Sequence, residues 1–387
     1  MNKANPALYA RKTQRLRSLF AFDSCRDGKA KQRLHRSVRM APALVAMPSS
    51  VPSAPVILLE KTAAPQAAEF INDWAENTEI FEYASAANPV LKPVPVMGLQ
   101  AKEHTSGPSR VVTLDLSKQL GIEEYAATSP NLLASFVRVC TGETLETTSS
   151  STSQAFYVIH GKGYSSTPAG KVSWSAGDLF VIPAGGRGQC SHTCIEDESG
   201  GAGLYWVNDA PLLSYLGVEP RVARFEPAYF SKEKLLSAVE RVRHEPGAAH
   251  RNRLGILLGN AKTADTKTLT HTLWSLLNVL PAGDWQRPHR HNSVALDLAV
   301  HAAPGAYTLM GPELDETGKI VNPVRCEWVT GSMFVTPPGW WHSHHNESPE
   351  EAWVLPMQDA GLYTHQRTLD IRFVEDEVRR LKEMRIK

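Results

Sequence analysis

The stretches GDWQRPHRH (residues 283–291) and GSMFVTPPGWWHSHHN (residues 331–346) decide the fold of this 387-residue chain. Side chains alternate across a strand, so His289 and His291 point to the same face of one strand. The Pro-Pro-Gly run in the second stretch predicts a sharp turn, which brings His342 toward that pair. Three imidazoles are therefore expected to converge inside a β structure.

Three neutral imidazoles on one side of a metal ion leave positions open for other ligands. This arrangement suits iron(II), manganese, nickel or copper better than a closed structural zinc site. We expect His289, His291 and His342 to bind iron(II), with Mn, Ni, Cu or Zn as alternatives. An isolated His-x-His pair is more often a surface basic cluster, but here the second stretch supplies the third histidine.

The same spacing occurs once upstream without the histidines. The upstream pattern consists of Gly142, Thr148, Ser150, Gln154, Gly161, Gly177, Pro183, Gly185 and Gly188. In it, Thr148 and Ser150 stand where the histidine pair would be, and Gly188 stands where the last histidine would fall. The upstream half is therefore predicted to be a barrel that binds no metal.

This duplicated pattern resembles the bicupin family, and within it gentisate 1,2-dioxygenase and relatives that act on salicylate or 1-hydroxy-2-naphthoate. The residues that carry the resemblance are 272–274, 288–296 and 331–346. The resemblance implies a mainly β fold of two cupin (double-stranded β-helix, jelly-roll) barrels with a few connecting helices. It also implies an iron(II) oxidoreductase that cleaves an aromatic ring with O2, usually as a homo-oligomer.

Two departures from the family pattern affect the predicted site. The metal ligands lie in the second barrel instead of the first. Asp297 stands where the gentisate enzymes carry an arginine that pairs with the substrate carboxylate. A carboxylate facing a carboxylated ring is repulsive, so the charge preference of the substrate is expected to be altered. Asp297 is either an acceptor that orients a ligand histidine, a contact or base for the substrate, or a residue turned outward by a bulge.

Five other side chains are candidates for the predicted site, together with Asp297. His344 and Asp297 are the predicted catalytic residues. The predicted substrate contacts are Trp340, Trp341, Asp297 and Arg325, although packing at the barrel rim or the surface is the alternative for both tryptophans and for Arg325. Gln358 is a further polar position that could reach a substrate.

Two other function classes stay open. The first is a metal-dependent lyase, isomerase or decarboxylase that acts without O2, and the second is a non-catalytic binding bicupin. We expect no nucleic-acid partner, because no nucleic-acid domain or phosphate-binding loop is evident. We also expect no membrane partner, since no run of eighteen apolar residues occurs.

Composition suggests how the chain is divided. Residues 1–39 carry a charge of +9, which leaves about −8 on the rest of a chain whose net charge is +1. We expect a basic, disordered segment over 1–55, the metal-free barrel with a preceding helix over 56–215, and a helical connection over 216–265. The metal-binding barrel and a C-terminal helix follow over 266–387. Five cysteines, an odd number, favour a reducing, cytoplasmic location, while the basic segment leaves organellar targeting open.

Overall fold

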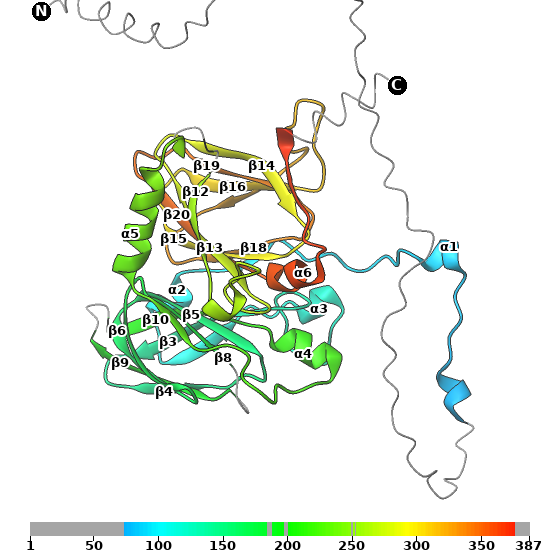
Figure 1. The fold of residues 1–387 in the computed structure, drawn as a ribbon, viewed down its shortest axis with the longest axis horizontal. Helices are drawn as coiled ribbons and strands as arrows, with labels where there is room; N and C mark the ends of the chain where they lie inside the picture. Colours follow the sequence, from blue (N-terminus) through cyan, green and yellow to red (C-terminus); the bar gives the residue numbers. More distant parts are fainter. Residues whose placement is uncertain (1–72, 184–187, 197–199, 249–250, 252, 376–387) are drawn as a thin grey trace, which may run out of the picture. The chain divides into compact units, whose positions relative to one another are not determined.

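The computed structural model describes residues 73–183, 188–196, 200–248, 251 and 253–375. The chain divides into two units, residues 1–80 and 81–387. In the first unit the described part contains the 3-10 helix η2 (Asp73–Asn77), which lies before the first barrel, where a helix is expected. The second unit is mainly β (Figure 1). The basic segment and residues 376–387 of the expected C-terminal helix lie outside the described residues.

The first barrel consists of two antiparallel sheets. One has the strand order β11-β8-β5-β10-β3-β2 and the other the order β4-β9-β6-β7. Their strands are β2 (Arg110–Thr113), β3 (Leu133–Cys140), β4 (Thr144–Thr147), β5 (Ser153–His160), β6 (Lys162–Thr167), β7 (Gly170–Ser175), β8 (Leu179–Pro183), β9 (Cys190–Glu196), β10 (Gly201–Asn208) and β11 (Ala228–Phe230).

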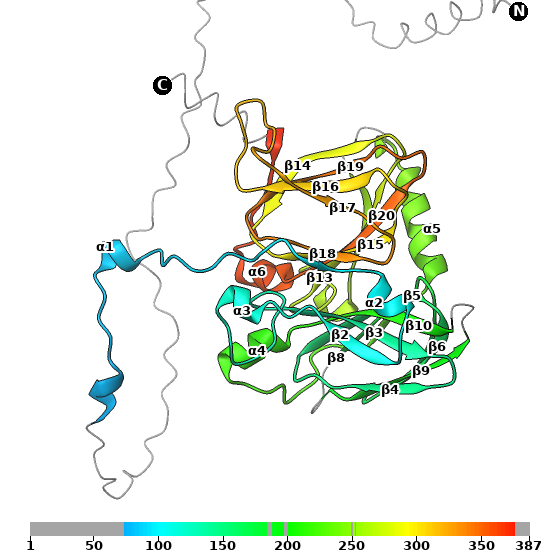
Figure 2. The same cartoon turned by 180° about the vertical axis from the view of Figure 1, so that it is seen from behind.

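The second barrel repeats this layout. Its sheets have the orders β1-β18-β15-β20-β13-β12 and β17-β16-β19-β14-β21. Their strands are β1 (Gly98–Leu99), β12 (Leu254–Leu258), β13 (Trp274–Leu280), β14 (Trp285–His291), β15 (Ala295–His301), β16 (Ala306–Gly311), β17 (Val324–Glu327), β18 (Met333–Thr336), β19 (Trp341–Asn346), β20 (Ala352–Gln358) and β21 (Ile371–Phe373). Figure 2 shows the two barrels from behind, with β14 and β19 on the side of the second barrel that faces away from the first.

Strand β1 precedes the first barrel in sequence but pairs with the second. Gly98 lies opposite Phe334 of β18, and a Cβ atom on Gly98 would lie 2.1 Å from the carbonyl oxygen of Met333. Only glycine allows this close approach. The pairing covers an edge of β18 that would otherwise expose unpaired backbone groups, and it ties residues expected in the first domain to the second barrel.

Helices connect the barrels and flank them. Helix α5 (Lys232–Arg243) begins at the N-cap Ser231, whose side chain accepts a hydrogen bond from the backbone N–H of Lys234, the arrangement that makes serine a favoured N-cap. It buries Leu235 and Val239. The shorter helices are α1 (Tyr83–Ala86), α2 (Lys102–Thr105), α3 (Ser117–Leu120), α4 (Ala210–Leu216), η4 (Ala261–Thr263) and α6 (Ala360–Gln366). Among the described residues, no helix is long and apolar enough to span a membrane.

One hydrophobic core is shared by the two barrels. Phe136 and Tyr205 of the first barrel belong to the same buried cluster as Leu296 and Leu355 of the second. The Tyr205 hydroxyl donates a hydrogen bond to the backbone carbonyl of Leu296 over 3.1 Å. Burial of this shared apolar surface stabilises the pair of barrels as one body and leaves the far sheet of the second barrel to form the site.

Candidate metal centre

His289, His291 and His342 lie together inside the second barrel. The first two are on β14 and the third is on β19, where His342 is the pairing partner of His289. One ligand nitrogen from each histidine lies within 4.8 Å of the other two. The ring centroids of His289 and His342 are 4.0 Å apart, and those of His291 and His342 are 4.9 Å apart. No second group of three potential ligands occurs in the part of the chain that the structure describes.

Hydrogen bonds to backbone carbonyls prepare two of these histidines as ligands. His291 Nδ1 lies 2.8 Å from the carbonyl of Ser293, and His342 Nδ1 lies 3.1 Å from that of Trp340. A carbonyl oxygen only accepts, so both Nδ1 atoms carry the proton and both Nε2 atoms keep a lone pair. Burial lowers the pKa of His291 to about 4 and that of His342 well below its usual value. Both rings are therefore neutral at pH 7, and their donor atoms fit a metal ion.

Arg253, which sequence reasoning missed, contacts the third histidine. Its Nη2 donates to His289 Nδ1 over 2.5 Å and to the backbone carbonyl of Arg287 over 3.1 Å. Its guanidinium carbon lies 5.4 Å from the centroid of the Phe373 ring. Burial lowers the pKa of Arg253 to about 10, so the side chain stays charged at pH 7. Because His289 Nδ1 accepts this bond, the single proton of the neutral ring is on Nε2. Coordination of a metal ion by His289 Nε2 therefore requires that the contact with Arg253 rearrange.

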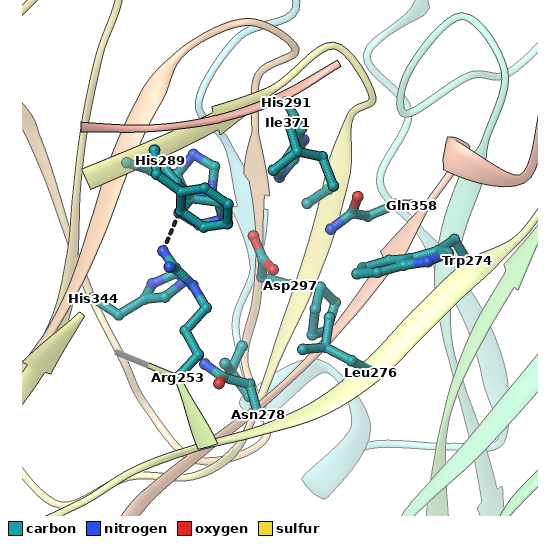
Figure 3. Close-up of a pocket in the computed structure, with 15 residues that line it drawn as sticks. Arg253, Trp274, Leu276, Asn278, His289, His291, Asp297, His344, Gln358 and Ile371 are labelled. Atoms are coloured by element: carbon teal, nitrogen blue, oxygen red, sulfur yellow. Dashed lines mark hydrogen bonds between the residues drawn. The ribbon is translucent and has the colours of Figure 1, made fainter. Parts of the chain in front are cut away.

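These groups line a cavity of about 130 Å³. Figure 3 shows the Arg253 side chain directed toward His289, Asp297 inside the cavity, and Trp274, Leu276 and Ile371 on its walls. The lining residues are Arg253, Trp274, Leu276, Asn278, His289, His291, Ala295, Asp297, His342, His344, Val354, Pro356, Gln358, Ile371 and Phe373. The cavity thus combines apolar and aromatic walls with a few converging polar groups, as small-molecule sites do.

Asp297 lies inside this cavity, on β15, and is 3% exposed. This position excludes the outward reading of Asp297. The Thr336 hydroxyl donates to its Oδ2 over 2.6 Å, whereas His291 and His342 are oriented by carbonyl groups. Burial raises the pKa of Asp297 to about 7, so its charge at neutral pH is only partial. Because Arg253 lines the same cavity, the repulsion of a carboxylated ring that was expected from Asp297 alone does not follow.

The structure brings only some of the other predicted residues to the cavity. His344 and Gln358 line it. Trp341 is buried beneath Arg290, and the guanidinium carbon of Arg290 lies 5.1 Å from the centroid of the Trp341 ring. The remaining two predicted contacts also lie elsewhere.

Trp340 packs against the hydrophobic cluster of Leu280 and Phe334. Arg325 lies over the ring of Tyr307 and forms an ion pair with Glu327. Trp340, Trp341 and Arg325 are not among the residues that line this cavity, so it offers no support for their role as substrate contacts.

The upstream barrel carries different substitutions from those that the glycine spacing predicted. Thr147 pairs with Cys190 as His289 pairs with His342. Thr147, Ser149 and Cys190 are all buried, while Thr148 and Ser150 are exposed. Counting from Gly142 was therefore one residue out of register, which moves every side chain to the opposite face of the strand. Cys190, not Gly188, stands where the last histidine would be.

Comparison with solved structures identifies the fold. The chain is similar to salicylate 1,2-dioxygenase from Pseudaminobacter salicylatoxidans, with a TM-score of 0.56 and 16% identity over 80% of this chain and 99% of that one. A structure of the same enzyme with gentisate gives a TM-score of 0.56 and 16% identity over 81% of this chain and 97% of that one. No protein-family model and no curated protein sequence matches the chain. The predicted mainly β bicupin fold is confirmed.

Proposed function

We propose that the protein is an iron(II)-dependent dioxygenase that cleaves a hydroxylated aromatic ring. The observation that carries the proposal is the convergence of three histidines on a cavity with aromatic walls, in which His291 and His342 keep free Nε2 lone pairs. The fold shared with salicylate 1,2-dioxygenase supports it. When bound, iron(II) would supply open positions for substrate oxygens and O2, together with electron transfer between them.

The chain's own residues would bind and orient the substrate. Trp274 and Phe373 are the aromatic members of the cavity wall, and their rings favour a flat aromatic substrate. Arg253 is a half-buried cation that can form charge-assisted hydrogen bonds with a carboxylate. Asp297, with a pKa of about 7, can accept a proton from a ring hydroxyl near neutral pH.

Arg253 and Asp297 together define the substrate that the cavity would accept. A ring with one anionic substituent and at least one hydroxyl places a negative group beside Arg253 and a hydrogen-bond donor beside Asp297. This proposal revises the preference for an uncarboxylated ring, which rested on Asp297 alone. Carboxylated phenols such as gentisate and salicylate are therefore the first compounds to test, with hydroquinone and catechol as uncharged comparisons.

Oxygen uptake by the purified protein tests the activity. The metal-free protein is loaded anaerobically with iron(II), and O2 consumption is followed with each of the four compounds. The expected result is uptake with a carboxylated phenol together with a ring-opened product. Turnover under strictly anaerobic conditions would instead indicate a lyase, isomerase or decarboxylase. Ligand binding without turnover would indicate a binding protein.

Arg253→Met tests the anion contact. Hydrogen bonds to charged groups contribute about 1.5–3 kcal/mol, so the variant should bind gentisate or salicylate roughly 10- to 150-fold more weakly. Binding of hydroquinone should change far less, which provides the matched comparison. An equal loss for both ligands would show that Arg253 supports the shape of the cavity and does not bind the anionic group.

A further inference from the structure

Trp328, Thr308 and His344 form a buried chain of hydrogen bonds that ends at the cavity. Trp328 Nε1 donates to Thr308 Oγ1 over 2.8 Å, and Thr308 Oγ1 lies 2.9 Å from His344 Nδ1. Thr308 and His344 are directly opposite each other in the pairing of β16 with β19. Trp328 is 3% exposed, Thr308 0% and His344 6%, so water does not replace these contacts.

The donors and acceptors in this chain determine where the His344 proton lies. An indole N–H can only donate, so Thr308 Oγ1 accepts from Trp328. The Thr308 hydroxyl then has its own proton to donate, and His344 Nδ1 is the acceptor that the structure provides. A ring nitrogen that accepts a hydrogen bond carries no proton, so the His344 ring is neutral and holds a single proton. With Nδ1 acting as an acceptor, that proton is on Nε2.

We propose that Trp328 and Thr308 are positioning residues that hold His344 in the Nε2-protonated form, so that it donates a hydrogen bond into the cavity instead of binding the metal. An N–H group has no lone pair to offer a metal ion. The ring of His344 lies close to the ligand rings, with its centroid 5.7 Å from that of His342 and 6.3 Å from that of His289. The acceptor would be a substrate oxygen, and this part of the inference rests on the proposed function.

The upstream barrel contains a second series of hydrogen bonds of the same kind. Trp174 Nε1 donates to Ser165 Oγ over 2.8 Å, and Ser165 Oγ lies 2.7 Å from His192 Nδ1. Ser165 and His192 are opposite each other in the pairing of β6 with β9, as Thr308 and His344 are in the second barrel. The far nitrogen, His192 Nε2, lies 2.9 Å from the Thr147 hydroxyl.

This second series shows which partner the histidine Nε2 has in a barrel without the three histidines. Thr147 occupies the position of His289, and in the upstream barrel it gives the histidine Nε2 a hydroxyl partner. In the second barrel that hydroxyl is replaced by a metal-ligand histidine, so His344 Nε2 is left facing the cavity that His344 lines. The recurring Trp-hydroxyl-His arrangement thus fixes the ring in both barrels, while the residue beyond it determines what the ring can bind.

Nitrogen NMR of the metal-free protein tests the proton position directly. Two-bond ¹H–¹⁵N spectra of histidine-labelled protein distinguish a protonated ring nitrogen from an unprotonated one, and His344→Gln assigns the signals of His344. We expect Nε2 protonation in the wild type and in Thr308→Ser, and a shift toward Nδ1 protonation in Thr308→Val. Nδ1 protonation in the wild type, or an unchanged tautomer in Thr308→Val, would overturn the proposal.

Controls separate positioning from damage to the fold. Unchanged His192 signals show that a Thr308 variant is folded. If Thr308→Val alone does not fold, the double variant Thr308→Val/Trp328→Phe removes the donor and the acceptor together, which is better tolerated than leaving one buried group unpaired. The same change of tautomer is expected in the double variant.

Ligand binding provides a second readout. Thr308→Val should bind gentisate about 3- to 10-fold more weakly, the loss of roughly one neutral hydrogen bond, and Thr308→Ser should restore binding. Ser165→Ala, the matched change in the upstream barrel, should leave binding unchanged. Equal losses in Thr308→Val and Ser165→Ala would contradict the positioning role. An Nε2-protonated His344 in a protein that consumes no O2 would support the positioning pair and refute the proposed activity.

Discussion

The two barrels share a framework but differ in their interiors. Asp209 and Asp359 each follow the last long strand of a barrel directly and are the N-cap of a short helix, α4 or α6. Each accepts a hydrogen bond from the backbone at the start of the strand alongside, from Ser153 over 3.1 Å in the first barrel and from Val294 over 3.0 Å in the second. The repeated features are thus those that fix the backbone, and the barrels differ at a few inward-facing positions.

One of these inward positions determines whether a cavity exists. Phe156 pairs with the residue three before Pro183, and Asp297 pairs with the residue three before Pro337, so the two are equivalent. Phe156 is stacked between Phe180 and Trp206, with ring centroids 5.0 and 5.6 Å away. In the first barrel aromatic packing occupies the space that the cavity takes up in the second. In the first barrel, the positions equivalent to His289 and His342 hold Thr147 and Cys190, and aromatic rings fill the adjoining space.

The largest difference between the barrels should appear in metal binding. His289→Ala removes one of three ligands, and losing even an outer partner of a ligand typically costs 10- to 100-fold in affinity. We expect metal affinity to fall by more than about 100-fold and activity to be lost. The wild type should bind one metal ion per chain, measured by elemental analysis and titration calorimetry.

Thr147→Ala is the matched variant, because Thr147 is the counterpart of His289 in the first barrel. It should leave both metal content and affinity unchanged. Two metal ions per chain, or a loss of metal in Thr147→Ala, would show that the first barrel is not metal-free.

The sequence predicted the framework and the clustering of the three histidines because both depend on local rules. Alternation placed His289 and His291 on one face, and the Pro-Pro-Gly turn delivered His342. These signals can be recognised in the sequence without any knowledge of long-range contacts. The same reasoning failed at Thr148 and Ser150, because a one-residue offset in a glycine count reverses the face of a strand.

Arg253 was beyond prediction for a different reason. It lies 36 positions before His289 and outside both histidine stretches, and it reaches the cavity only because β12 pairs with β13 at the edge of the sheet. Trp340 and Trp341 show the reverse error, since closeness to His342 in sequence did not place them in the cavity. Proximity along the chain is a poor guide where alternate side chains point to opposite faces.

Phe156→Ala should destabilise the protein, because the first barrel is filled. Deletion of a buried phenylalanine side chain typically costs about 3–5 kcal/mol, which includes the cavity that remains. We expect a loss of this size in the free energy of unfolding, measured by urea denaturation of the metal-free protein. A cost below about 1 kcal/mol would show that the interior of the first barrel is loosely packed.

Asp297→Asn at the equivalent position should have the opposite sign and depend on pH. Burial raises the pKa of Asp297 from 3.8 to about 7 in the folded protein. Between these values the folded protein binds more protons than the unfolded chain, so stability falls as pH rises through this window and levels off above it. Asparagine cannot ionise but still offers an oxygen to the Thr336 hydroxyl. The variant should therefore gain stability relative to the wild type as pH rises.

The expected gain follows from the part of the window that an experiment can cover. Between pH 5 and the folded-state pKa of about 7, the wild type loses stability over about two pH units. The stability advantage of Asp297→Asn should therefore grow by about 2–3 kcal/mol between pH 5 and pH 8. Asp359 has a raised pKa in the same window, but its effect cancels in the difference between variant and wild type. A difference that does not change between pH 5 and pH 8 would mean that Asp297 ionises freely in the folded protein. Arg253 would then face a fully charged carboxylate, and a ring with no net charge would become the better candidate substrate.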